Sequence, residues 1–259
     1  IQYYAIYANA SVPVLKDKLV AQLGGRDAYN SSYHAPVTPS VNILYTPISK
    51  FQFRASYTQG FRAPALKEMY LSFVDAQHNL KGNPDLKAEK SDNYQLSGSY
   101  QAWEQGRNYL QFIVTGYYNN VYNGIVLVNI DPTNPNSVNY QYRNFDHMEN
   151  AIGNFQADGQ LNNFHFQAGY AYTYTLGRTG IFSAYGASEV TATLQYTFRK
   201  PALNVNLMYK YNGPRPMITP DITGAPLFDG HAAGYQICDG SIEKKFFNNR
   251  LQIIAGGKN

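Results

Sequence analysis

Two side chains in the first third of the chain have the chemistry of a binding site. His78 lies in a polar stretch between Gln77 and Asn79, and its imidazole nitrogen can ligate a metal or simply be solvated. Arg62 carries a guanidinium that can hold an anionic ligand or another domain, or can form an ion pair that packs the protein. The residue types leave both alternatives open at both positions.

The remaining histidines are scattered, and the sequence predicts no enzyme. They are His34, His147, His165 and His231. Strand alternation places His165 on a polar face and His231 in a loop, where a lone histidine is usually solvated or hydrogen-bonded. There is no glycine-rich phosphate loop, zinc-ligand spacing or nucleophile elbow, and the acidic residues form no recognisable pair. Binding is therefore favoured over catalysis.

The stretch that positions His78 and Arg62 is a pair of strands with a long loop between them. Residues 51–58 alternate apolar and polar side chains, and residues 94–100 do the same. This period of two is typical of a sheet with one apolar and one polar face. A loop of about thirty residues between two regular strands is usually functional.

Composition indicates how the chain meets its surroundings. It contains 24 tyrosines against 4 methionines and 1 tryptophan, and its net charge is +4. This net charge is small and is spread along the chain, so it does not indicate nucleic-acid binding. No apolar run is long enough for a transmembrane helix. The other way to cross a bilayer is a closed barrel of strands. Because apolar and polar residues alternate along such strands, a hydropathy average over a sliding window of residues does not detect them.

The same alternation recurs along the chain and predicts about twelve strands. The early strands are expected at residues 2–9, 19–25 and 41–45, with a connection through Pro13. Later ones are expected at residues 109–128, 164–174, 190–198 and 203–211. Short turns near residues 50, 106, 162, 201 and 248 alternate with long loops at 27–36, 64–91, 129–139, 176–188 and 213–232. Outer-membrane barrels have this asymmetry of brief periplasmic turns and extended outer loops.

Tyrosines on the apolar faces agree with a membrane barrel. Tyr57 and Tyr100 are examples that lie near expected strand ends. An amphipathic ring at such a position can lie at the level of the lipid headgroups. We therefore expect a girdle of aromatic side chains at each membrane interface. Sheet propensity is a second explanation for the many tyrosines, because it also enriches tyrosine in strands.

Two separated motifs in the long loop carry a family resemblance. The first is Phe61, Arg62, Ala63 and Pro64, followed by residues 66–70; the second is Asn83, Pro84, Asp85 and Leu86, followed by Glu89 and Ser91. They resemble the FRAP and NPDL boxes of TonB-dependent outer-membrane receptors, in the right order and at a plausible spacing. The run at residues 256–259 is similar to the GVKN often found near the C-terminal end of such barrels.

The resemblance implies an all-β fold, a transmembrane antiparallel β-barrel of which about twelve strands are present. Residues 1–259 would be the C-terminal portion of the barrel of a larger, plugged receptor. The plug domain and the final, aromatic-ended strand are not visible and are expected outside this sequence, and the N-terminal strands are too, because residues 1–4 already resemble mid-strand. Twelve strands alone would leave two open edges in lipid.

The implied function is active import of a scarce, bulky nutrient across a bacterial outer membrane. In the haem-importing branch of the family, a histidine between the two boxes is an axial ligand, which makes His78 the candidate haem ligand. Haem is then the transported ligand, and no permanent cofactor is expected. Outer-loop aromatics such as Phe73, Tyr185 and Phe228 could stack on a flat macrocycle. The box residues themselves are expected to shape the base of the loop, with one helical turn at residues 66–70.

The resemblance also implies partners and leaves alternatives open. The energising complex of TonB, ExbB and ExbD would act through the plug, outer-membrane lipid would surround the barrel, and a surface lipoprotein could cap the loops. A cobalamin or iron–siderophore receptor shares the boxes and is the alternative substrate class. A passive porin or a soluble β-rich binding module is the alternative of another class.

Overall fold

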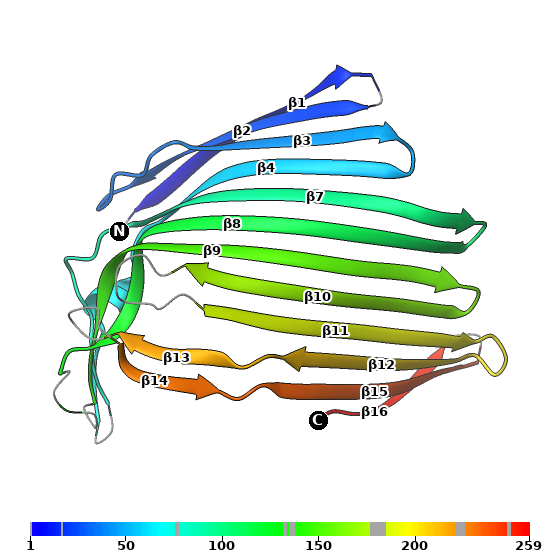
Figure 1. The fold of residues 1–259 in the computed structure, drawn as a ribbon. Helices are drawn as coiled ribbons and strands as arrows, with labels where there is room; N and C mark the ends of the chain where they lie inside the picture. The colour runs from blue at the N-terminus through cyan, green and yellow to red at the C-terminus, as the bar shows by residue number, and fades with distance from the viewer. Residues whose placement is uncertain are drawn as a thin grey trace.

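The computed structural model describes residues 2–16, 18–75, 78–131, 134, 138–176, 185–220, 226–247 and 250–259. Most of them form one large sheet, whose long neighbouring strands are antiparallel and which curves like part of a barrel wall (Figure 1). In the described part of the chain, no helix has the length and apolar character needed to cross a membrane.

The wall follows the order of the sequence, each strand lying beside the next along the chain. Its strands are β1 (Tyr3–Leu15), β2 (Leu19–Asn30), β3 (Thr38–Ile48), β4 (Phe51–Arg62), β7 (Glu89–Gln105), β8 (Asn108–Asn129), β9 (Asn139–Leu161), β10 (Phe164–Leu176), β11 (Tyr185–Phe198), β12 (Leu203–Asn212), β15 (Tyr235–Phe246) and β16 (Leu251–Gly257). The prediction of about twelve barrel strands is confirmed.

The remaining elements lie in the connections. Helix α1 (Leu66–Tyr70), β5 (Ser72–Val74) and β6 (Asn79–Lys81) lie between β4 and β7, and β13 (Arg215–Pro220) pairs with β14 (Pro226–Ala232) between β12 and β15. The helical turn expected at residues 66–70 is confirmed. The loop expected at residues 213–232 is instead largely a hairpin. Its prolines and glycines are typical of loops, so its two short strands were not predicted.

Short and long connections lie at opposite ends of the sheet, as predicted (Figure 1). The short turns are at the right of the figure, and their backbone often needs the left-handed region. Gly106 has a φ of 62° and Asn162 a φ of 54°, a conformation that glycine and asparagine adopt most readily. The end with the long connections is called the loop end below.

Several strands extend further than their prolines suggested. The strand expected at residues 2–9 runs on through Pro13 to Leu15, and the one expected at 41–45 includes Pro47. Both prolines lie at a break in the register with the neighbouring strand, between Pro13 and Leu15 and between Tyr45 and Ile48. Proline is tolerated in sheets at such irregularities. The loop predicted at 27–36 likewise begins only after Asn30.

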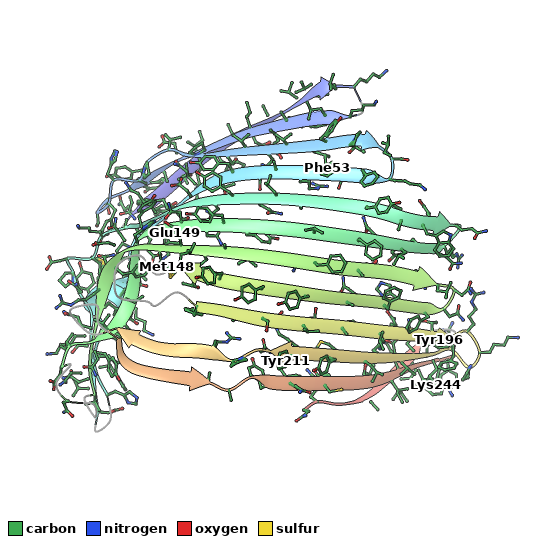
Figure 2. All side chains as sticks on the ribbon, viewed as in Figure 1. Phe53, Met148, Glu149, Tyr196, Tyr211 and Lys244 are labelled. Carbon is green, nitrogen blue, oxygen red and sulfur yellow. The ribbon has the colours of Figure 1, made fainter. Side chains whose placement is uncertain are left out.

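The two faces of the wall differ in chemistry. On one face Phe53, Leu96 and Val114 of three adjacent strands are 47%, 68% and 57% exposed. Phe53 is labelled in Figure 2. The opposite face carries polar pairs such as Asn42 with Ser56. In a closed barrel the apolar face meets lipid and the polar face lines a wet lumen. The two are called the lipid face and the lumen face.

Aromatic side chains lie toward both ends of the lipid face. Near the loop end, the rings of Tyr57 and Tyr94 have centroids 5.0 Å apart, and Tyr118 follows at 6.2 Å from Tyr94. Near the short turns, the Phe51 and Tyr100 rings stack at 4.5 Å. Such rings suit the two membrane–water interfaces, so the expected girdles are present.

The buried apolar side chains lie outside the wall. Among the described residues they are Ala35, Met69, Leu86, Val128 and Phe145. All five belong to the long connections or to the strand ends that lead into them. A barrel wall with lipid on one side and a lumen on the other has no dry interior of its own, whereas the loop end builds a small one.

Candidate functional site

Residues 63–75 and 78–88 form a platform at the loop end. The Glu68 carboxylate accepts a hydrogen bond from the Ala65 N–H at 2.7 Å and so caps the first turn of α1. The Glu68 carbonyl accepts from the Asn83 N–H at 2.9 Å. One glutamate thus connects the two boxes.

The second box is a turn held by its own asparagine. The Asn83 side-chain oxygen accepts a hydrogen bond from the Asp85 N–H at 3.0 Å, and the Asn83 carbonyl accepts from the Leu86 N–H at 3.4 Å. This local bonding is typical of asparagine in turns. It directs Leu86 inward, where 3% of it stays exposed. These contacts agree with the expectation that the boxes shape the base of the loop.

Arg62 lies at the last position of β4 and binds two carboxylates. Its Nη1 lies 2.9 Å from Glu68 Oε2, and its Nε donates to Glu89 Oε2. Of the two alternatives that the sequence left open, an ion pair that packs the protein is present. The guanidinium fork suits this geometry because separate N–H groups reach the two acids.

Glu89 is the first residue of β7 and lies above the stretch that would cross the bilayer. Its other oxygen, Oε1, accepts a hydrogen bond from the Ile125 N–H at 2.6 Å. Burial alone would raise the pKa of Glu89, but the hydrogen bonds from Arg62 and Ile125 outweigh it and hold that pKa below its ordinary value. The carboxylate is therefore ionised, and it connects β4, β7 and β8.

His78 lies directly before β6, in the connection from β5. Its Nδ1 lies 3.1 Å and 3.2 Å from the two carboxylate oxygens of Asp75, and its side chain is 52% exposed. The Phe73 ring lies 6.2 Å away, inclined by 47°. Since Nδ1 is engaged by Asp75, Nε2 is the nitrogen that suits an iron, and a carboxylate on the other nitrogen raises the basicity of a ligating histidine.

The other histidines lie in different surroundings. His34 lies exposed in the β2–β3 connection, His147 on β9 stacks on Tyr122 with centroids 4.9 Å apart, and the His165 Nε2 lies 3.2 Å from Asp158 Oδ2 on the lumen face. The side chains of His231 and Phe228 lie outside the described residues. Tyr185 begins β11.

No group of three or more His, Cys, Asp or Glu side chains that could hold a metal occurs in the described ranges. One imidazole can still be an axial ligand to the iron of a macrocycle that supplies the equatorial ligands.

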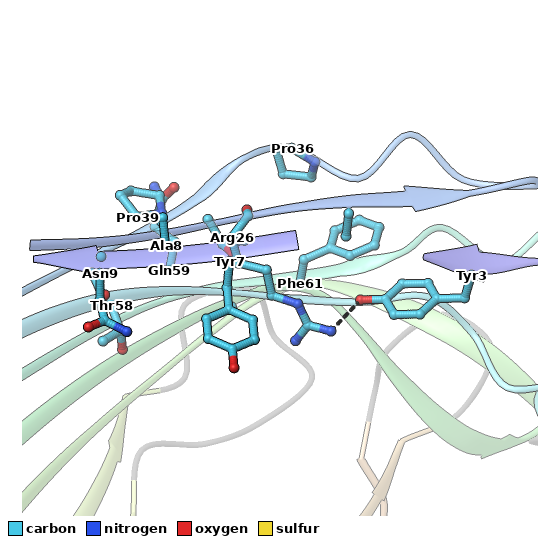
Figure 3. A pocket seen from close by; sticks show the side chains of 16 residues that line it. Tyr3, Tyr7, Ala8, Asn9, Arg26, Pro36, Pro39, Thr58, Gln59 and Phe61 are labelled. Atoms are coloured by element: carbon cyan, nitrogen blue, oxygen red, sulfur yellow. Dashed lines mark hydrogen bonds between the residues drawn. The ribbon is translucent and has the colours of Figure 1, made fainter. Parts of the chain in front are cut away.

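A recess on the lumen face was not predicted from the sequence. It measures about 400 Å³ and lies against β1 to β4 (Figure 3). Arg26 donates to the Tyr3 hydroxyl at 2.8 Å at its margin, and Gly24 and Gly60 leave room because a Cβ at either would collide with a serine hydroxyl. Paired small residues on adjacent strands are the signal that could have found it.

Comparisons with known proteins agree with this architecture. Residues 1–259 match the family model described as TonB dependent receptor-like, beta-barrel. The ferric enterobactin receptor of Pseudomonas aeruginosa superposes with a TM-score of 0.71 at 16% identity, over 98% of this chain and 38% of that one. The siderophore receptor PirA of the same organism gives 0.69 at 18%, over 99% and 42%. These likenesses show the fold.

Curated relatives match at low identity. A probable hemoglobin and hemoglobin-haptoglobin-binding protein 3 of Haemophilus influenzae is 26% identical over 176 residues, which cover 63% of this chain and 15% of that protein. The heme/hemopexin utilization protein C of another strain is 23% identical over 207 residues, 71% and 27% respectively. The chain therefore spans a small part of their length.

The match along the whole chain, the all-antiparallel wall and the apolar outer face lead to one assignment. They do not agree with a soluble module, and the family is one of receptors and not of enzymes. The chain belongs to the TonB-dependent receptor family of outer-membrane β-barrels and forms part of such a barrel.

Proposed function

We propose that the complete receptor imports haem across the outer membrane and that His78 is an axial ligand to the haem iron at the outer face. The observation that carries this proposal is the position of His78: it lies on an anchored hairpin at the loop end, with Nδ1 bonded to Asp75 and half of its side chain exposed. Phe73 beside it offers a ring to a flat macrocycle.

The relatives support haem as the substrate class. Five curated relatives, including the two described above, carry names that refer to haem, hemoglobin or hemoglobin-haptoglobin. Each match covers only part of this chain, so the substrate is a proposal that needs its own test. No permanent cofactor is part of the proposal, since haem is the cargo.

Import of this kind needs work. A ligand bound tightly enough to be captured at low concentration leaves slowly, so inward release has to be driven. In the proposed mechanism a plug blocks the lumen, and the complex of TonB, ExbB and ExbD pulls on it. Outer-membrane lipid covers the lipid face, and a surface lipoprotein is a further proposed partner at the loop end.

A siderophore or corrinoid is the second candidate substrate. The solved structures with the same fold include siderophore receptors, and a vitamin B12 transporter of Photobacterium profundum is 32% identical over 108 residues, 41% of this chain. These ligands require no axial histidine from the receptor loop. A role for His78 therefore separates the two candidates.

The test is a haem titration of the full-length receptor in detergent, followed by Soret absorbance. His78→Ala should weaken binding about tenfold or more and shift the Soret band, because an iron ligand is lost. His34→Ala is the matched control, since His34 is also an exposed histidine at the loop end, and it should leave both unchanged. Equal spectra and affinities for His78→Ala and the unmodified receptor would remove His78 from the site.

A further inference from the structure

β8 and β9 form an arm that continues beyond the wall at the loop end. The ladder between β7 and β8 stops at Lys90 and Tyr122, and the ladder between β9 and β10 stops at Glu149 and Leu176. β8 and β9 nevertheless remain paired with each other from residues 124 and 145 to residues 129 and 140. Residues 123–129 and 139–147 are called the arm.

The hairpin that carries His78 is docked on this arm. β6 pairs in parallel with the start of β9, so that Asn79 lies opposite Asn139. The Asn79 N–H donates to the Val138 carbonyl at 2.8 Å, and the Asn79 side-chain amide donates to Asn139 Oδ1 at 2.7 Å. The residue directly after His78 is thus bonded to the arm by backbone and side chain.

Asn144 fastens the other side of the same loop. Its Oδ1 accepts a hydrogen bond from the Lys87 N–H at 2.8 Å, while its Nδ2 donates to the Lys87 carbonyl at 3.0 Å and to the Asn123 carbonyl at 2.7 Å. A carboxamide carries a donor and an acceptor on one planar group, as the backbone peptide does. The side chain therefore replaces a missing strand neighbour for Lys87.

The Asn144 contact lies beside the glutamate anchor. Asn144 is paired with Ile125 across the arm, and the Ile125 N–H binds Glu89. Residues 87–89 are consequently held by both members of one cross-strand pair. The loop also begins at Arg62, which binds Glu89. The C-terminal end of the loop and its His78 hairpin are thereby fastened to the arm, and Arg62 connects the N-terminal end to it through Glu89.

We propose that Asn144 is a positioning residue that locks the platform, residues 63–75 and 78–88, onto the β8–β9 arm, so that the platform and the arm move as one body. The part of this inference that concerns haem rests on the function proposed above. The locking itself does not depend on which ligand the receptor takes.

The experiment compares Asn144→Ala with Asn154→Ala in the full-length receptor. Asn154 lies on the same strand but inside the wall, paired with Thr115 and Ala171. Hydrogen exchange of residues 79–88 should become about tenfold faster or more in Asn144→Ala, because three hydrogen bonds are lost. Asn154→Ala should leave those amides unchanged. Heat-dependent migration in detergent gels verifies that both barrels are folded.

Haem titration supplies the second readout. Asn144→Ala should weaken haem binding and give part of the Soret shift seen in His78→Ala, because the imidazole is intact but no longer held in place. Unchanged exchange in residues 79–88 would overturn the locking. Faster exchange with unchanged haem binding would overturn the positioning role. If His78→Ala itself leaves haem binding unchanged, the proposed function fails, while the exchange comparison still decides the locking.

Discussion

Glu89 Oε2 accepts a hydrogen bond from Arg62 Nε at the point where the ladder between β4 and β7 ends and the platform begins. The same carboxylate reaches the neighbouring strand through the Ile125 N–H. One charge pair therefore closes the base of the loop that carries His78.

Arg62→Lys should loosen the platform although it keeps the charge. A lysine ammonium cannot reproduce the fork that meets Glu68 through Nη1 and Glu89 through Nε. We expect a loss of about 1 kcal/mol in the local opening free energy, reduced by the partial exposure of Arg62. Protease cleavage within residues 63–88 measures it. Arg54→Lys is the control, since Arg54 binds Gln52 within the wall; equal cleavage of both variants would contradict the prediction.

The anchor should weaken in acid. Because the pKa of Glu89 is lowered in the folded protein, its carboxylate contributes stability that is complete above its ordinary value of 4.5 and is lost as the pH falls through the lowered value. The Ile125 amide signal in nuclear magnetic resonance spectra should therefore shift only in acid. Glu89→Gln removes the titrating group, and the same acid shift in that variant would refute the assignment.

Gly124→Ala should damage the arm. A Cβ at residue 124 would overlap the Phe145 ring on the paired strand, whereas nothing lies within 4 Å of a Cβ at Gly116 on the same β8. Overpacking of this kind costs about 1–3 kcal/mol. Hydrogen exchange of residues 139–147 should accelerate in Gly124→Ala and not in the control Gly116→Ala. Restoration by the additional change Phe145→Leu would tie the effect to the ring.

A lysine introduced on either face of β7 tests which face of the wall meets lipid. Leu96 is 68% exposed on the lipid face and lies opposite Ala55 and Gly116, while Ser97 lies on the lumen face. Leu96→Lys should destabilise the full-length barrel in lipid vesicles by about 2–4 kcal/mol, as expected for a cation near the bilayer midplane. Ser97→Lys should have a much smaller effect. Urea unfolding in vesicles measures both, and the reverse order would contradict the assignment of the faces.

The sequence by itself determined that the wall is built of about twelve strands, which face each side chain takes, and the family. Alternation of apolar and polar side chains is a local property, so residues 51–58 and 164–174 could be assigned before any pairing was known. The two boxes at residues 61–64 and 83–86, and the order in which they occur, likewise indicated the family. Register breaks at Pro13 and Pro47 were not visible, because they depend on the neighbouring strand.

Only the tertiary structure decided how the platform is held. Asn144 and Lys87 are far apart in sequence, and nothing in either residue type marks a bond between them. The ion pairs of Arg62 likewise depend on Glu68 and Glu89 lying beside it in the folded chain. Periodicity specifies which way a side chain faces within its own strand. Contacts between distant strands follow from register and from the arm that extends past the wall, and those are properties of the assembled sheet.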